Sequence, residues 1–483
     1  MHITFRSAWR LAALLLLGLL LAVPACTPAS RRPSGKKKEP EIILQTEAHD
    51  ERAGARAATA IASQVGVIDD PILSSYVLHL GRRLARHAPQ TDFTYRFHIV
   101  DQDAPNAFAL PGGYIYISRG LLLLANSEDE LANVIGHEIV HVARRHAAAR
   151  QGLIRGLPAI FQMFFMGQVA SYSRDQEREA DSIGQTLAGV AGYDPDGLAR
   201  FLRNLEFTER LALGFSRMQG YLDSHPATSE RVATAGARAR TIEWTRQPGL
   251  LPNANAYLRQ LDGLVVGMGA SEGVVDRGRF LHADLGFSMR FPDGWDVVNT
   301  HSAVGAVSPQ RNAQIVLQLQ GAGDDARQAS LEYLEEPDVQ GLRVASEQPI
   351  LLGDLEAYRI EGSAGTAMGS VGVHLTWIPR GGSIYRITGI SLRRKSRGGI
   401  FANVARSFRP LTPRERRSIH ETRLRVVKAM PGESLGELSA RTGNSWNLQQ
   451  TAVSNALFAD ARLEEGQLVK VAVPQAYSAT PDR

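Results

Sequence analysis

Apolar positions between Ser127 and Gln151 recur at the spacing of an α-helix. Ser127 and Glu130 form a capping-box pattern, in which each side chain can hydrogen-bond the other residue's backbone N–H at the start of a helix. The positions that would form its buried face are Leu131, Val134, Ile135, Ile139 and Val142. The pattern therefore predicts a buried helix over residues 127–151.

A second capping-box pattern, at Ser173 and Gln176, predicts another helix downstream. Upstream, Ala107 to Leu110 and Tyr114 to Ser118 are β-type runs on either side of a Pro-Gly-Gly turn. The remainder of residues 41–275 is mostly helical in pattern. These features predict a mainly helical first domain with a small sheet.

Residues 280–411 change character, because Phe287, Met289 and Phe291 alternate with other residues and further strand-like runs follow. The alternation predicts an antiparallel sheet, and the stretch "ARQASLEYLEE" adds one short helix. The result is an α+β domain, which resembles the PsbP-like sandwich domains. No constellation of residues in it carries chemistry, so we expect a binding or spacer role.

Residues 421–475 form a third predicted unit, with a strand, two helices and a final strand. The turn from Pro431 to Leu435, Asn455 after the second helix, and Gly466 with Gln467 before the last strand resemble the LysM module, a small βααβ fold. The resemblance implies binding of N-acetylglucosamine glycans such as peptidoglycan. A plain accessory domain is the alternative.

The N-terminus has the pattern of a secretion signal, with Arg6 and Arg10 before an apolar run from Leu11 to Val23. This run is too short to span a membrane comfortably. The stretch "LAVPAC" resembles the lipobox of bacterial lipoproteins, which implies that Cys26 is lipidated and becomes the mature N-terminus. An ordinary signal peptide with an incidental Cys26 is the alternative. Residues 1–25 would be the signal, and residues 26–40 a flexible tether.

Composition and charge narrow the function classes. A chain of 483 residues with ordinary globular composition is expected to hold several domains. Its formal charge of +5 is small and spread along the chain, which argues against nucleic-acid binding. Because Cys26 is the only cysteine, the chain has no intramolecular disulfide. The predicted class is a multidomain α+β protein.

The stretch "GHEIVHVARRH" holds the candidate chemistry. On a helix, residues four apart differ by about 40° around the axis, so His137 and His141 project side by side and can reach one ion. With Glu138 they form the H-E-x-x-H arrangement, in which two imidazoles hold zinc and the glutamate takes a proton from the attacking water. His146 would lie roughly 180° from His137 if the helix continued, so we do not expect it to be a ligand.

A zinc site needs a third protein ligand, and "SRDQEREADSIG" offers one. Glu177 and Asp181 are four apart and share a helical face. We predict that Glu177 binds the metal and that Asp181 accepts the free N–H of a ligating histidine. An exchange of roles between Glu177 and Glu179 stays open. A surface helix with scattered histidines is the alternative to a site holding one zinc ion per chain.

These residues resemble the zinc metallopeptidases (gluzincins) that include the CAAX prenyl endopeptidases and HtpX, and most of all the exported BepA-like envelope proteases. The resemblance covers residues 41–275 and rests on "NAFALPGGYIYISRGLL", "SEDELANVIGHEIVHVARRH", "SRDQEREADSIG" and "SHPATSERV". It implies a peptidase domain of the zincin type with an edge strand beside the zinc. BepA-like proteins carry helical repeats in their C-terminal half, and this sequence has none after Phe280.

The resemblance also implies roles for individual residues. Gly113, Tyr114 and Ile115 would lie in the groove where an extended substrate pairs with the edge strand. His225 would close the zinc site as a fourth ligand and keep the enzyme latent, whereas Arg231 would support activity. A His-Pro turn that merely starts a helix is the alternative for His225.

The function expected from these features is a zinc-dependent metalloendopeptidase that cleaves misfolded or stalled envelope proteins. It would act on the periplasmic side of the cell envelope, as an outer-membrane lipoprotein held by its lipid anchor, and could also bind peptidoglycan. The alternative, from another class, is an envelope chaperone or peptidoglycan-binding scaffold whose zinc site is latent.

Overall fold

The computed structural model of the chain describes residues 47–89, 94–146, 172–212, 221, 225, 228–336, 339, 341–366, 369–392 and 398–478. The chain divides into two compact units. We call Ile43–Met268 with His420–Gln475 the helical unit, and the unit containing Gly269–Ile419 the sheet unit. The predicted signal, Cys26 and the tether lie outside the described residues. Among the helices that are described, none is both long and apolar enough to cross a membrane.

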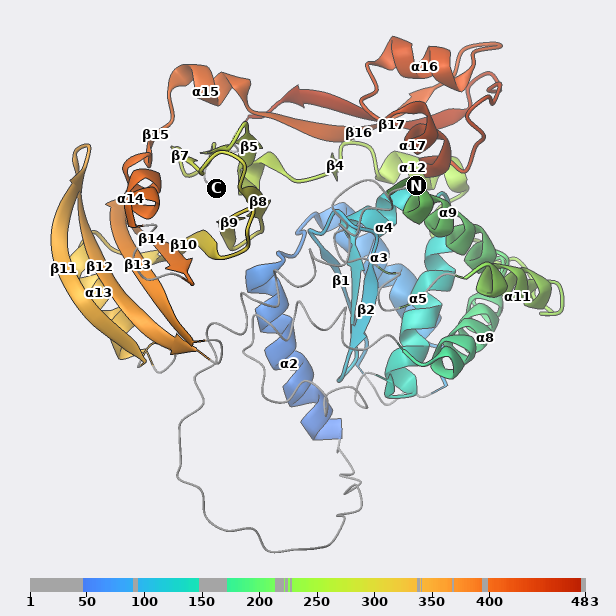
Figure 1. Ribbon diagram of the computed structural model, residues 1–483. Coiled ribbons are helices and arrows are strands. Elements are labelled where there is room, and N and C mark those ends of the chain that lie inside the picture. Colours follow the sequence, from blue (N-terminus) through green and yellow to red (C-terminus); the bar gives the residue numbers. More distant parts are fainter. Residues whose placement is uncertain are drawn as a thin grey trace, which may run out of the picture. The chain divides into compact units, whose positions relative to one another are not determined.

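The helical unit is built around helix α5, which packs against α8, α9 and α3 (Figure 1). Every residue of α5 from Glu130 to Ala143 is buried, and its apolar positions join a large core shared with α3, α4, α8 and α9. In the described part of this unit, the helices before the C-terminal segment are α2 (Glu47–Gln64), α3 (Pro71–Ala85), α4 (Arg119–Leu124), α5 (Glu128–Ala143), α8 (Arg174–Val190), α9 (Gly197–Ala212), α11 (Ser229–Ala239) and α12 (Ala254–Gln260). The predicted mainly helical domain is thus present.

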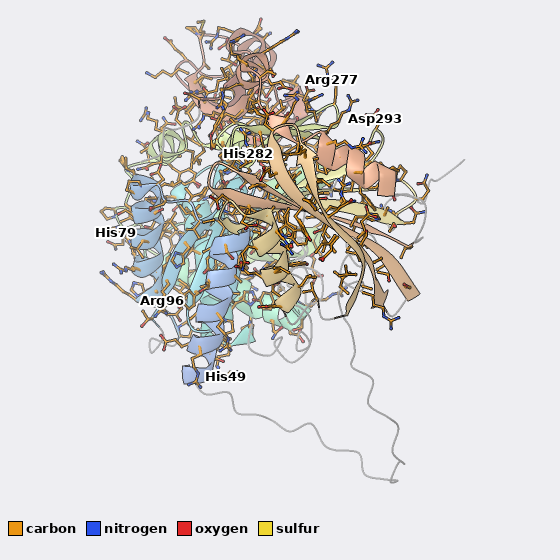
Figure 2. The ribbon with its side chains drawn as sticks, turned by 90° about the vertical axis from the view of Figure 1, so that its left-hand side faces the viewer. His49, His79, Arg96, Arg277, His282 and Asp293 are labelled. Atoms are coloured by element: carbon orange, nitrogen blue, oxygen red, sulfur yellow. The ribbon has the colours of Figure 1, made fainter. Side chains whose placement is uncertain are left out.

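A three-stranded sheet lies beside these helices, made of β1 (Arg96–Val100), β2 (Ala107–Leu110) and β3 (Tyr114–Ser118). Its order is β1-β3-β2, with β1 parallel and β2 antiparallel to β3. Gly112 and Gly113 adopt positive φ angles of 78° and 90° in the turn between β2 and β3, a conformation that glycine reaches without strain. Arg96 projects from β1 (Figure 2). Its guanidinium lies over the ring of Tyr114.

The strand order corrects one prediction from the sequence. Tyr114 and Ile115 begin β3, which is the central strand and is paired on both sides, and Gly113 immediately precedes it with its carbonyl bonded to the N–H of Arg96. They cannot offer a free edge to a substrate, because their backbone groups already belong to the sheet. The edge strand that packs against α5 is β2.

The C-terminal segment of the helical unit has the predicted order of strand, helix, helix and strand. Its elements are β16 (His420–Lys428), α16 (Leu435–Thr442), α17 (Leu448–Ser454) and β17 (Leu468–Ala476). Capping boxes at Ser434 and Asn447 start the two helices, and Gly443 in the left-handed conformation ends the first. We call residues 420–475 the C-terminal module.

This module packs on the rest of the helical unit. Strand β16 pairs with β4 (Val265–Val266), and Leu424 and Leu468 join the core around α5. The fully buried Lys470 donates from Nζ to the carbonyl oxygens of Leu123 and Ala125, at 2.6 and 3.0 Å. The sequence predicted a separate third unit, whereas the structure places the module in the same compact unit as residues 43–268.

The sheet unit is built from two antiparallel sheets, as the alternation of Phe287, Met289 and Phe291 predicted. These three residues are buried. The seven-stranded sheet has the order β11-β12-β13-β14-β10-β9-β8, and the four-stranded sheet has the order β15-β7-β6-β5. The strands are β5 (Val274–Asp276), β6 (Arg279–His282), β7 (Phe287–Arg290), β8 (Asp296–Asn299), β9 (Ala303–Val307), β10 (Ala313–Ala322), β11 (Leu342–Leu352), β12 (Leu355–Thr366), β13 (Gly369–Arg380), β14 (Ser383–Ser391) and β15 (Arg409–Pro410).

This unit also contains α13 (Ala326–Glu335), α14 (Gly398–Arg406), α15 (Pro413–Ser418) and the 3₁₀ turn η1 (Ala270–Glu272). The predicted short helix corresponds to α13, which packs on β12 and β13. With several antiparallel sheets and a mainly helical unit, the multidomain α+β architecture is confirmed.

Candidate metal centre

Helix α5 carries the two histidines and the glutamate of the H-E-x-x-H arrangement. Ser127 is its N-cap and accepts from the backbone N–H of Glu130, whose carboxylate accepts in turn from the N–H of Asn126. The helix ends at Ala143, eight residues before the predicted end at Gln151. The earlier end has a physical cause, because Arg145 adopts a φ of 54°, which an α-helix cannot continue.

Helix α8 brings the second pair of functional residues to α5. Ser173 and Gln176 form the predicted capping box. Gly184 on α8 lies so close to α5 that a Cβ atom there would be 2.8 Å from the backbone nitrogen of His137. Because Gly184 has no side chain, the backbones of the two helices come close together, and Glu177 and Asp181 lie against the histidines of α5.

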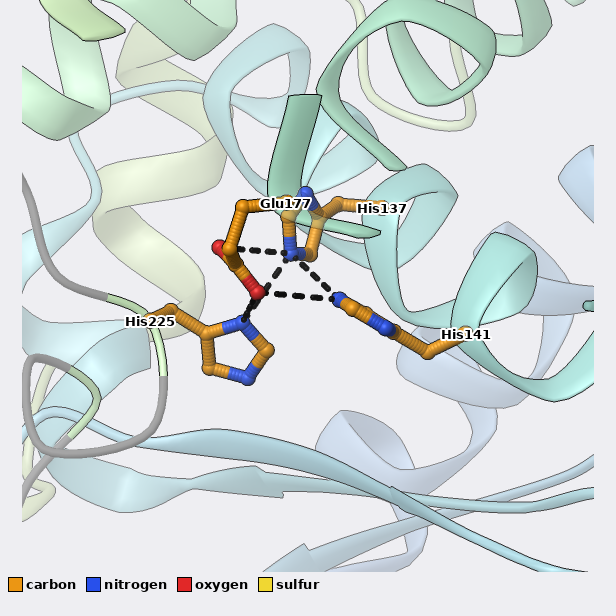
Figure 3. Close-up of side chains that lie close together, drawn as sticks. All are labelled: His137, His141, Glu177 and His225. Carbon is orange, nitrogen blue, oxygen red and sulfur yellow. Dashed lines mark hydrogen bonds and ion pairs between the residues drawn. The ribbon is translucent and has the colours of Figure 1, made fainter. Parts of the chain in front are cut away.

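Four buried side chains converge at this crossing: His137, His141, Glu177 and His225 (Figure 3). The Nε2 atom of His137 lies 2.9 Å from Nε2 of His141 and 3.1 Å from Nδ1 of His225. Oε1 of Glu177 lies 2.8 Å from that Nδ1 atom and 3.4 Å from Nε2 of His141. The four predicted ligands are thus brought together, and Glu179 and His146 are not members of the group.

The four ligand atoms fit a tetrahedral zinc ion. All lie within 4.8 Å of one another. Zinc holds imidazole nitrogen and carboxylate oxygen at about 2.0–2.2 Å, which places tetrahedral ligands roughly 3.4 Å apart. Nitrogen atoms of three imidazoles aimed at one buried point also need a cation or a shared proton between them, and zinc supplies that cation. The predicted set is therefore suitable for zinc in its donor chemistry and spacing.

A buried ion-pair network supports the ligands from α8 and α11. Asp181 Oδ1 lies 2.9 Å from Nδ1 of His137, as expected for the group that orients a ligating histidine. Arg231, at the start of α11, contacts both oxygens of Asp181 at 2.9 and 2.7 Å and reaches Oε2 of Glu177 at 2.9 Å. Arg231 thus holds the carboxylates of Glu177 and Asp181 and is not itself in the ligand group.

The charges of the network shift the pKa values of its members. Burial opposes ionisation of Glu177, but His225 and His137 outweigh it and hold the pKa of that carboxyl well below its ordinary value. Burial likewise opposes ionisation of Asp181, and Arg231 lowers its pKa overall. For His141, burial dominates and lowers the pKa well below the ordinary value. An ionised glutamate and a neutral imidazole are the forms that bind a metal.

Glu138 and two tyrosines also lie around the four ligands. Glu138 is fully buried, and its Oε1 lies 3.6 Å from Nε2 of His225. The ring of Tyr221 stacks on His225 with centroids 4.3 Å apart, and the ring of Tyr172 stacks on His141 at 3.6 Å. Sequence reasoning missed both tyrosines, because neither belongs to a spacing motif. The one available signal is that Tyr172 immediately precedes the capping box of α8.

Comparisons with known proteins identify what this region is similar to. Residues 71–171 and 148–239 match Peptidase family M48. The metal centre lies in this M48-like region. The chain is 31% identical over 201 residues to the beta-barrel assembly-enhancing protease of Escherichia coli, which is 36% of this chain and 41% of that protein. It is also 27% identical over 173 residues to the mitochondrial metalloendopeptidase OMA1 of Schizosaccharomyces pombe, covering 32% of this chain and 50% of that protein.

A further relative is the mitochondrial metalloendopeptidase OMA1 of Arabidopsis thaliana, at 35% identity over 148 residues, or 28% of this chain and 29% of that protein. The matches thus span half or less of each relative's length. They agree with the predicted resemblance of this region to zinc metallopeptidases, and its buried group of His137, His141, Glu177 and His225 could hold a metal ion. The expected closeness to the CAAX prenyl endopeptidases and HtpX, and the LysM likeness, stay predictions.

Among solved structures, that of cyanobacterial PsbP from Synechocystis covers 30% of this chain and 99% of its own, at 14% identity and a TM-score of 0.24. At that score the likeness carries no argument. The PsbP-like character of residues 280–411 therefore also stays a prediction.

Proposed function

We propose that this protein is an exported zinc-dependent metalloendopeptidase that hydrolyses peptide bonds of misfolded or stalled cell-envelope proteins. The observation that carries the proposal is the convergence of His137, His141 and Glu177 in a buried group, with Glu138 beside it. The relatives named as metalloendopeptidases and as an assembly-enhancing protease support the same reaction.

Each residue of the centre has a role in this proposal. His137, His141 and Glu177 hold one zinc ion per chain. When bound, zinc lowers the pKa of a water molecule and polarises the scissile carbonyl group. Glu138 removes the proton from that water and delivers it to the leaving amine. Asp181 and Arg231 keep His137 and Glu177 in place.

His225 is proposed as the group that keeps the enzyme latent. Its Nδ1 atom is one of the four convergent ligand atoms, and its other nitrogen faces Glu138 at 3.6 Å. In this position the imidazole fills the place where water would meet the base, so attack on a substrate is blocked. Removal of His225 from the group would open a fourth ligand position, as catalytic zinc sites require.

The groove for an extended substrate is proposed at β2 instead of β3. Strand β2 is the edge strand that packs on α5. An edge strand lets a peptide pair through its main chain, without a particular side-chain sequence. Main-chain recognition suits unfolded proteins as substrates, because any extended segment can satisfy it.

The place of action is proposed from the N-terminal sequence. The signal pattern in residues 1–25 and the lipobox-like "LAVPAC" favour export to the periplasmic side, with Cys26 as the lipid anchor in the outer membrane. Labelling with a radioactive fatty acid, lost in Cys26→Ser, would establish the anchor.

The purified chain provides the test of the main proposal. We expect about one zinc ion per chain in the parent and in Glu138→Gln, because Glu138 is not a ligand. The His225→Ala protein should cleave unfolded casein, and the same protein carrying Glu138→Gln should not. Glu230→Gln, which alters an exposed carboxylate on α11, is the matched control and should leave cleavage unchanged. A parent without zinc, or equal cleavage with and without Glu138, would reject the proposal.

A second candidate function is an envelope chaperone or peptidoglycan-binding scaffold with a latent metal centre. One observation favours a ligand surface on the C-terminal module. Phe458 is 83% exposed and Met430 is 52% exposed. The backbone N–H of Leu463 donates to the carbonyl of Glu433, which brings the two loops that hold these side chains together. Exposed apolar side chains on adjoining loops are typical of binding surfaces.

Peptidoglycan pull-down with the full chain distinguishes the two candidates. Binding that is lost in Phe458→Ala, with no casein cleavage even in His225→Ala, would favour the scaffold. Leu351→Ala, an exposed apolar residue of the sheet unit, is the control for nonspecific adhesion.

A further inference from the structure

His146 lies against a ligand of the metal centre although helix geometry predicted the opposite. Its Nδ1 atom is 2.9 Å from Nδ1 of His141, and the residue is only 6% exposed. The prediction assumed that α5 continues past Arg144. Because the helix ends at Ala143 and Arg145 takes a positive φ, the chain turns back and returns His146 to the end of the helix.

The turn that carries His146 is anchored from another helix. Arg145 contacts Oδ2 of Asp50 on α2 at 2.6 Å, and Asp50 is 1% exposed. A non-glycine residue with positive φ is strained, so it persists only where its surroundings hold it. The ion pair with a buried carboxylate provides that hold. The position of His146 is thus built into the fold.

The hydrogen-bonding capacity of the two rings decides how they interact. His141 directs Nε2 into the group of four ligands, so a metal would take the lone pair of that atom. The proton of a neutral His141 then sits on Nδ1, and the atom facing it is Nδ1 of His146. His146 must therefore accept at Nδ1 and carry its own proton on Nε2.

Glu179 is placed to accept from the N–H at Nε2 of His146. Its Oε2 lies 3.5 Å from Nε2 of His146, and its Oε1 lies 2.9 Å from Nε of Arg144. The sequence left open whether Glu179 exchanges roles with Glu177. Glu179 is instead directed to the outer side of His146, as the last member of a chain of contacts that leads to the ligand His141.

The two ligating histidines of α5 differ in what faces their second ring nitrogen. His137 has its Nδ1 against the carboxylate of Asp181. Among the described side chains, no carboxylate is paired with Nδ1 of His141, and His146 takes that place. A ligating histidine generally donates its second N–H to a group that fixes its tautomer and the direction of its ring. We propose that His146, held by Glu179, is the positioning residue that orients His141 for zinc.

This inference rests on the proposed zinc site, and zinc affinity tests it separately from catalysis. The affinity of the purified chain is measured by competition with a chromophoric chelator. We expect His146→Ala to weaken zinc binding by about 10–100-fold, the usual effect of removing such a partner. His146→Asn should restore most of the affinity, because its side-chain oxygen can accept near the position of Nδ1. Glu179→Gln should cause a smaller loss.

The control for general damage is the stability of the metal-free protein. His146→Ala should leave the melting temperature of the metal-free chain close to that of the parent and reduce the rise caused by zinc. His79→Ala, on the exposed face of α3 (Figure 2), should change neither quantity.

Three outcomes would overturn the inference. Zinc affinity of His146→Ala within twofold of the parent would show that His141 needs no such partner. If His146→Asn lost as much zinc affinity as His146→Ala, and both variants also lowered the melting temperature of the metal-free chain, His146 would have a packing role alone. A parent that binds no zinc would reject the proposed site itself, and this inference with it.

Discussion

Gly136 and Gly184 lie backbone to backbone where α5 crosses α8. A Cβ atom on Gly136 would be 2.9 Å from the carbonyl oxygen of Gly184, and one on Gly184 would be 3.1 Å from the carbonyl carbon of Gly136. The metal centre depends on this approach, because His137 follows Gly136 directly and Glu177 lies two turns before Gly184. No other residue allows the two helices to come so close.

The first prediction follows from this contact. Gly184→Ala should force α5 and α8 apart, because the new methyl group would meet backbone atoms that cannot rotate away. We expect a loss of about 1–3 kcal/mol in the free energy of unfolding, as overpacking usually causes. Zinc affinity should also fall, since the ligands come from both helices. Urea denaturation and chelator competition measure the two effects.

Gly236→Ala is the matched control for this prediction. Gly236 also lies in a helix, α11, but a Cβ there would meet its nearest atoms at 3.7 and 3.8 Å, which is ordinary contact. Alanine is the better helix former by about 1 kcal/mol, so this variant should be as stable as the parent or more so. Equal stability and zinc affinity in the two variants would contradict the proposed role of the crossing.

The second prediction concerns latency. His225→Ala should raise cleavage of unfolded casein several-fold, because a ligand position opens and Glu138 is no longer faced by an imidazole. The three remaining ligands match the number found in catalytic zinc sites, so the zinc content should be unchanged. The measurement is the initial rate of casein cleavage against zinc content. An unchanged rate with zinc fully retained would count against latency through His225.

The third prediction is a pH dependence set by Lys470. Burial of the amine lowers the pKa of Lys470 to about 7, against an ordinary 10.5, and nearby Glu130 only partly offsets this effect. Between these values the unfolded chain binds more protons than the folded chain, so stability should rise with pH, by up to about 1.4 kcal/mol per pH unit. Below pH 7 both states are protonated, and this contribution no longer changes.

Urea midpoints of the helical unit between pH 7 and 10 test this dependence. Lys470→Met should flatten the slope, because methionine fills similar space without a titratable group. The neutral amine still has two N–H groups for the carbonyls of Leu123 and Ala125, so docking of the C-terminal module should persist at high pH. Lys428→Met, on the same module, is the control. An identical slope in parent and Lys470→Met would contradict the assignment.

Local patterns were sufficient for much of the site. The spacing of His137 and His141, and of Glu177 and Asp181, is a property of one helix each, so the sequence alone could place each pair on a common face. The N-cap at Ser127 and the capping box at Ser173 are local as well, and both helices begin where the sequence patterns predicted. The packing of α5 against α8 does not follow from local patterns. It was predicted because two histidines need a third protein ligand to hold zinc, and Glu177 is of a suitable residue type.

Other features depend on contacts between segments far apart in the chain. Strand order is one, and it moved the candidate substrate edge from β3 to β2. The docking of the C-terminal module is another, because the partners of Lys470 are backbone carbonyls that no side-chain pattern reveals.

The sequence by itself determined the helical class of the first domain, the donor set for zinc and the candidate base Glu138, since these follow from periodicity and residue chemistry. Only the tertiary structure decided the place of His146. Arg145 has a positive φ and is held by Asp50 from another helix, so the chain changes direction after α5. As a result His146, which helical geometry placed away from the ligands, contacts His141. Backbone reversals of this kind are fixed by long-range contacts, and helical periodicity carries no information about them.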